Sequence, residues 1–168
     1  MAVRGRKKRG VNIKNPIVKN ILLALAVAFF GFILLNITFL FDAVYQGVLR
    51  RIVGLFISLS PDTNAYWVPL LMHGSFALVV LIISWFVFKS KLKVLYKAIY
   101  MIVPLAVVLA TIGIFFYQWP IIPYSLGALI SIGLLYYFYR TKQPWLYYYT
   151  VILVSLTLAI FTLLGGEI

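Results

Sequence analysis

Residues 21–41 read ILLALAVAFFGFILLNITFLF, a stretch that contains no charged side chain. The hydrocarbon core of a bilayer is about 30 Å thick, and a helix needs about 20 apolar residues to cross it. The run is too long for the apolar part of a cleaved signal peptide, and it lacks a clear small-residue cleavage site. It therefore predicts a retained signal-anchor helix that crosses the membrane.

Four further stretches share this length and apolar character, and none carries a charge in its interior. They are residues 67–88, 98–117, 121–139 and 145–164. Over the whole chain 64% of residues are hydrophobic and 11% are charged, whereas soluble domains are about 45–50% apolar and about 25% charged. We therefore expect an all-α integral membrane protein, with a basic arm at 1–20 and a single transmembrane domain of five helices at 21–168.

Basic residues are divided unevenly between the two sides of such a bundle. The arm, the segment between the second and third helices, and the segment between the fourth and fifth helices all fall on one side. Together they hold thirteen of the fifteen lysines and arginines. Because basic residues accumulate on the cytoplasmic side of membrane proteins, the sequence predicts a cytoplasmic N-terminus and an extracytoplasmic C-terminus.

Residues 43–59 are apolar on one side but contain Arg50 and Arg51. As a further span they would place two charges near the bilayer centre, at a cost of several kcal/mol. On a helical wheel the arginines, glycines and other polar residues gather along one face. The pattern predicts an amphipathic helix between the first and second spans, lying at the outer interface with its apolar face toward lipid.

An internal duplication is suggested when the chain is shifted against itself by 51 residues. The shift aligns the second and third helices with the fourth and fifth and gives nine identities, among them Tyr66 with Tyr117, Lys91 with Lys142, and Leu95-Tyr96 with Leu146-Tyr147. Apolar sequences also match one another by composition alone. If the repeat is genuine, the two hairpins are related by an axis along the membrane normal.

A candidate binding site combines the few polar residues expected on the outer side. They are Asp42, Arg50, Arg51, Asp62, His73 and Gln118. Arginine side chains bind phosphate or carboxylate groups through two parallel hydrogen bonds, which would suit an anionic head group. In the alternative interpretation the aspartates pair with the arginines and hold the interfacial helix, while His73 is a neutral residue bonded to a neighbouring helix.

The sequence predicts no catalytic residue, metal site or cofactor. It contains no cysteine and a single histidine, which excludes thiolate ligands and bis-histidine haem. The arm carries Arg6, Lys7, Lys8 and Arg9, which we expect to contact anionic lipid head groups or only to fix the topology. The net charge of +12 comes from basic residues whose positions match the predicted sides of the membrane, so we expect no nucleic-acid partner.

Small residues spaced four apart let two helices approach closely in a membrane. Such pairs occur at Ala24 and Ala28, at Ala106 and Ala110, and at Gly127 and Ser131. They either pack the bundle or hold a protein partner or a second copy of the chain.

Three function classes remain open. The best supported is a non-catalytic accessory or assembly subunit of a membrane complex, because the spans are nearly devoid of polar groups and the loops are short. The alternative is a carrier or binder of a lipid or a small hydrophobic or anionic solute, with its site at the outer-leaflet face. The weakest is a membrane-embedded enzyme that acts on lipid head groups, since only His73 with Asp42 or Asp62 could supply acid–base chemistry.

Overall fold

The computed structural model describes residues 15–56, 67–119 and 121–164, and these residues form five α-helices. The helices are α1 (Pro16–Phe56), α2 (Trp67–Lys89), α3 (Val94–Phe115), α4 (Ile121–Arg140) and α5 (Trp145–Leu163). All five are long and apolar enough to cross a membrane, so the chain is an integral multi-pass membrane protein. The predicted all-helical class is confirmed, and the largest shift among the last four spans is at α3, which begins at Val94 rather than at residue 98.

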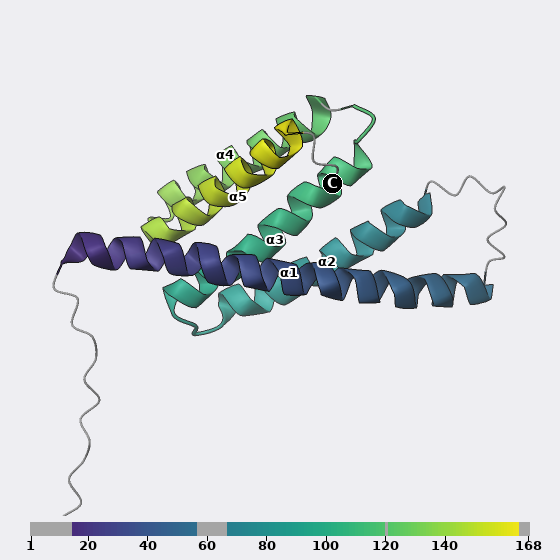
Figure 1. The fold of residues 1–168 in the computed structure, drawn as a ribbon, viewed down its shortest axis with the longest axis horizontal. Coiled ribbons are helices and arrows are strands. Elements are labelled where there is room, and N and C mark those ends of the chain that lie inside the picture. Colours follow the sequence, from purple (N-terminus) through teal and green to yellow (C-terminus); the bar gives the residue numbers. More distant parts are fainter. Residues whose placement is uncertain (1–14, 57–66, 120, 165–168) are drawn as a thin grey trace, which may run out of the picture.

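α1 corrects one feature of the sequence analysis. The expected break after Phe41 is absent, and the predicted interfacial segment continues the first span as a single helix of 41 residues (Figure 1). Neither proline nor glycine occurs between residues 32 and 46, so nothing interrupts the backbone hydrogen bonds there. At 1.5 Å per residue α1 is about 60 Å long, about twice the hydrocarbon thickness. Residues 57–59 of the predicted segment lie outside the described residues.

α3 occupies the centre of the bundle and packs against each of the other four helices (Figure 1). Short turns join it to α2 and join α4 to α5, so each of these pairs is an antiparallel hairpin. α1 crosses the other helices obliquely and makes its main contacts with α3. α3 continues through Pro104 without a break.

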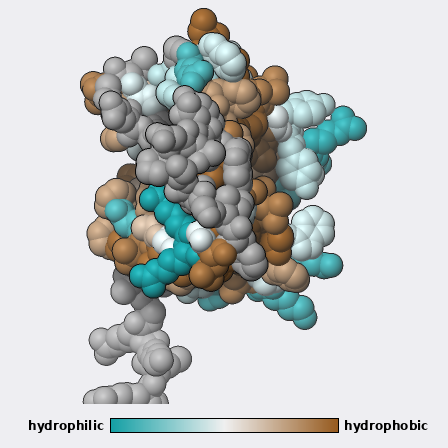
Figure 2. Space-filling model, turned by 90° about the vertical axis from the view of Figure 1, so that its right-hand side faces the viewer, coloured by the Kyte–Doolittle hydropathy of each residue, from teal (hydrophilic) through white to brown (hydrophobic). Residues whose placement is uncertain are grey.

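Two clusters of buried apolar side chains hold the described helices together. The larger one joins α1, α3, α4 and α5 and includes Val27, Ala98, Ala106, Phe138 and Val151. The smaller one joins α2 to α3, with partly buried residues of α1 packed against it. Most other apolar side chains are exposed, and much of the coloured surface in Figure 2 is brown. This exposure is expected where lipid, rather than water, surrounds the helices.

One end of the bundle collects the basic residues. The turns at residues 90–93 and 141–144 lie there, together with the first residues of α1 (Figure 1). α4 ends in a tight turn in which the Gln143 N–H donates to the Phe138 carbonyl (3.0 Å) and the Lys142 N–H donates to the Tyr139 carbonyl (3.2 Å). Lys142 adopts the left-handed conformation that this turn requires, with φ 51°.

Candidate functional site

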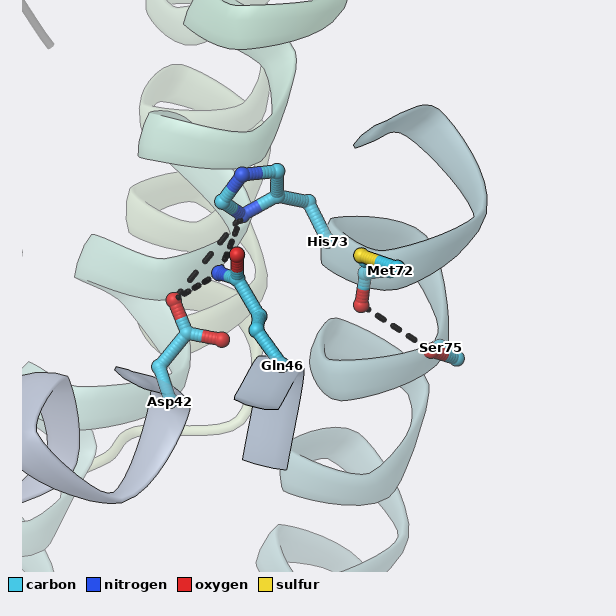
Figure 3. A network of polar contacts seen from close by, with 5 residues as sticks. All are labelled: Asp42, Gln46, Met72, His73 and Ser75. Atoms are coloured by element: carbon cyan, nitrogen blue, oxygen red, sulfur yellow. Dashed lines mark hydrogen bonds and ion pairs between the residues drawn. The ribbon is translucent and has the colours of Figure 1, made fainter. Parts of the chain in front are cut away.

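The candidate site is a polar cluster of Asp42 and Gln46 from α1 and His73 from α2, named here the Asp42 cluster (Figure 3). The Gln46 amide donates to Asp42 Oδ2 at 2.8 Å, and its nitrogen lies 3.3 Å from His73 Nδ1. His73 Nδ1 lies 3.8 Å from Asp42 Oδ2, which is too long for a hydrogen bond but close enough for an ion pair when the imidazole is protonated.

The local fold explains why these three side chains meet. Asp42 and Gln46 are four residues apart on α1 and so share one face of the helix. The same face carries Tyr45, whose ring contacts the ring of Phe76 on α2 with centroids 5.6 Å apart. His73 lies three residues before Phe76 on α2 and therefore faces α1 as well.

The cluster is largely removed from the surface. The side chains of His73 and Asp42 are 23% and 17% exposed. Asp42 Oδ1 is buried and has no hydrogen-bond partner among the described residues. A buried carboxylate oxygen without a partner is unfavourable, so the site favours a hydrogen-bond donor at this atom.

The cluster differs from the six-residue site expected from the sequence. Asp42 and His73 lie together, but Arg50 and Arg51 are exposed and form no ion pair with any described residue. Gln118 is exposed, and its amide donates to Tyr117 Oη at 3.1 Å rather than to the cluster. Asp62 and the arm residues Arg6, Lys7, Lys8 and Arg9 lie outside the described residues.

Sequence reasoning did not include Gln46 in the site. Its spacing of four residues from Asp42 was the available signal, since the two side chains must be neighbours on any helix that contains both.

The Asp42 cluster has neither a nearby nucleophile on α2 nor a set of metal ligands. Ser75, the nearest hydroxyl on α2, donates to the Met72 carbonyl at 2.9 Å and points away from His73 (Figure 3). The described residues contain no group of three metal-binding side chains.

A cavity of about 580 Å³ lies elsewhere, between α3, α4 and α5. Its polar groups include Ser131 and Ser155, whose hydroxyl oxygens are 2.8 Å apart. Its other lining side chains are mainly apolar, and none belongs to the Asp42 cluster. The cavity is therefore separate from the Asp42 cluster.

Comparison of the chain with protein-family models, curated proteins and solved structures finds no match.

Proposed function

We propose that this protein is a non-catalytic accessory or assembly subunit of a membrane complex, and that the second half of α1 holds its partner. The observation that supports this proposal is a strip of small and polar residues on that half. The strip consists of Ala43, Gly47, Arg50 and Gly54, all of which are exposed. We refer to these four residues as the α1 strip.

The α1 strip has the spacing of a helix-packing face. Its members follow one another at intervals of four, three and four residues, so they lie on one side of the helix. Apart from the neighbouring backbone, no atom of the described residues lies within 4 Å of the place where a Cβ would stand on Gly47 or Gly54. Glycines in this arrangement allow the backbone of a second helix to approach closely.

Two of the three small-residue pairs noted in the sequence are used for packing inside the bundle. Ala106 and Ala110 are buried within the bundle. A Cβ on Gly127 would lie 3.4 Å from Leu109 of α3, and Ser131 contacts Ser155 of α5. The chain thus uses small residues where helices meet, and by the same logic the α1 strip is suited to a helix from another molecule.

Native mass spectrometry of the full chain, extracted gently from its own membrane, tests this proposal. We expect one stoichiometric second protein, which is lost in the double variant Gly47→Leu and Gly54→Leu. Gly133→Leu is the matched control, because Gly133 of α4 is also exposed and has nothing within 4 Å. A chain that is always recovered alone would contradict the proposal, and a complex of identical copies would replace the accessory subunit with a homo-oligomer.

The second candidate is a carrier or binder of a lipid or of a small hydrophobic or anionic solute. The Asp42 cluster supports it, because paired polar groups between two apolar helices are costly to retain without a role. A carrier should bind its ligand without a partner and be impaired by His73→Ala, Arg50→Ala or Arg51→Ala. Normal binding by all three variants would exclude this site. An enzyme acting on head groups is supported least, and it would lose turnover with His73→Ala while keeping its fold.

The orientation in the membrane is part of the proposal. The positive-inside pattern supports a cytoplasmic N-terminus and an extracytoplasmic C-terminus. The chain has no cysteine, so single cysteines at positions 62 and 142 provide a direct test. An impermeant thiol reagent applied to intact cells should label position 62 alone, and labelling at 142 without leakage would reverse the topology.

We also infer that the α2–α3 and α4–α5 hairpins are a tandem duplication, supported by the identities at an offset of 51 residues. An experimental structure in which the two hairpins fail to superpose about an axis along the membrane normal would refute this inference.

A further inference from the structure

A groove runs along α3 between α2 and α4. Both of these helices belong to hairpins, but they do not contact each other in the described chain, and the surface of α3 lies between them. The groove has a volume of about 810 Å³, within the roughly 300–1,000 Å³ of sites that hold small organic molecules. It is distinct from the Asp42 cluster and from the α1 strip, so it is independent of the function proposed above.

Most of the groove is apolar. Its floor on α3 includes Met101, Pro104 and Leu105, and its walls include Trp85 on α2 and Leu134 on α4. Three hydroxyl-bearing residues line the groove, namely Ser84, Tyr137 and Tyr147. Ser84 already donates to the Val80 carbonyl at 2.7 Å. A long hydrocarbon chain fits this lining, because it needs no hydrogen-bond partner.

The end of the groove nearest the turns is polar and positive. Lys97 and Gln143 line it there. Lys97 Nζ donates one hydrogen bond, to the Phe88 carbonyl at 2.6 Å, and a lysine ammonium has three donors in all. Gln143 is half-buried, and its side chain forms no hydrogen bond with the described residues.

The surrounding charges have one sign. Seven of the nine basic residues that the structure describes lie at this end of the bundle: Lys19, Lys89, Lys91, Lys93, Lys97, Arg140 and Lys142. Asp42 is the one carboxylate within the described ranges, and it lies toward the opposite end of the bundle, where it contacts His73 in the second turn of α2. An anion is therefore attracted to the mouth of the groove, and a hydrocarbon chain is favoured in its interior.

We propose that this groove binds one acyl chain of an anionic phospholipid, whose head-group phosphate contacts Lys97 and Gln143. The positive end selects an anionic over a zwitterionic lipid, since each basic residue near a membrane surface contributes about 1 kcal/mol of attraction to anionic lipid. The apolar interior selects a lipid over a water-soluble anion. If Lys97 served only to donate a hydrogen bond to the Phe88 carbonyl at the end of α2, its charge would not change which lipid the groove prefers.

Trp85 provides a local reporter, because it lines the groove and is 68% exposed. In a full-length chain with Trp67, Trp119 and Trp145 changed to Phe, we would compare fluorescence quenching by phosphatidylglycerol and by phosphatidylcholine with brominated acyl chains. We expect phosphatidylglycerol to associate about fivefold more strongly, the factor that corresponds to about 1 kcal/mol for one lysine. Lys97→Gln should bring this ratio close to one, and Lys97→Arg should preserve it.

Lys91→Gln is the matched control, because Lys91 lies in the turn just before α3, at the same end of the bundle, but does not line the groove. This variant should keep the preference. A second control retains Trp119 alone, which is exposed in the turn before α4 at the other end of the bundle and should show no preference. Circular dichroism verifies the helicity of each variant, and Gln143→Leu gives a second test of the head-group contact if Lys97→Gln does not fold.

Three results would overturn the proposal. Equal quenching of Trp85 by both lipids would show that the groove does not prefer an anionic lipid over a zwitterionic one. An equal loss of preference in Lys91→Gln and Lys97→Gln would show diffuse attraction to the basic end rather than a site. Abolition of the preference by excess inorganic phosphate would show that the site takes a free anion instead of a lipid.

Discussion

α1 and α3 have similar hydropathy but opposite places in the fold. In the most apolar stretch of α3, 50% of the residues are buried within the described chain. In the corresponding stretch of α1 the share is 11%. α3 packs against the other four described helices and carries alanines at these contacts, whereas α1 crosses the bundle on one side. Hydropathy therefore identifies which segments enter the membrane, and small residues with chain order decide which of them becomes central.

The largest effect on this contrast is expected from Ala106→Phe in α3. Ala106 is 1% exposed, so a phenyl ring there must displace neighbouring helices. Overpacking a close-packed interior typically costs about 1–3 kcal/mol and occasionally more. Ala43→Phe on the exposed face of α1 is the control and should cost little. Thermal or denaturant unfolding in detergent would measure both, and equal losses would contradict the difference between the helices.

Gly31→Leu tests the contact between α1 and α3. A Cβ on Gly31 would overlap the side chain of Ile102, whereas Gly47 has nothing within 4 Å. Because the end of Ile102 can rotate away, Gly31→Ala should be mild, but Gly31→Leu should cost about 1–3 kcal/mol. The same unfolding measurement on Gly47→Leu should show almost no loss in the isolated chain. A comparable loss of stability at both glycines would mean that the Gly31 face of α1 does not pack against α3.

Asp42→Asn should raise stability rather than lower it. The substitution removes the charge of a carboxylate whose Oδ1 is buried without a partner, and it leaves an oxygen that can accept from Gln46. An unpaired buried group costs more when it is charged than when it is neutral, so exchange of the carboxylate for an amide should recover about 1 kcal/mol. Gln46→Leu should not stabilise, because it leaves the carboxylate in place. Destabilisation by Asp42→Asn would show that the charge is compensated within the folded chain.

The smallest effect concerns the hydroxyl pair that joins α4 to α5. Ser131 and Ser155 lie with their oxygens 2.8 Å apart. Hydrogen bonds between membrane helices contribute about 0.6 kcal/mol on average, so Ser131→Ala should cost about that much. A double-mutant cycle with Ser155→Ala separates the pair from its surroundings. Additive losses would mean that the two hydroxyls do not interact.

The sequence predicted the five helices because each apolar run ends at charges, prolines or short polar turns. It did not predict the length of α1, since residues 43–59 show the same amphipathic pattern whether the helix continues or bends after Phe41. The central place of α3 was also hidden, because all five runs are similarly apolar. Both facts depend on contacts between helices that no local pattern encodes.

The candidate site was predictable only in part. The sequence indicates Asp42 and His73 as candidates, because ionisable residues in apolar segments are costly and rare. Their meeting with Gln46, and the exposure of Arg50 and Arg51, depend on how α1 is rotated against α2. The groove at Lys97 has no signature in the sequence, because it exists only where α2 and α4 stand apart.

The most direct test of the central claim is site-specific crosslinking in the native membrane. Single cysteines at positions 47 and 133, in this cysteine-free chain, would each carry a photoactivatable group. The account predicts one defined crosslinked protein from position 47 of the α1 strip and none from position 133 of α4. Crosslinks to lipid alone from position 47, or the same protein from both positions, would contradict the assignment of the α1 strip to a partner.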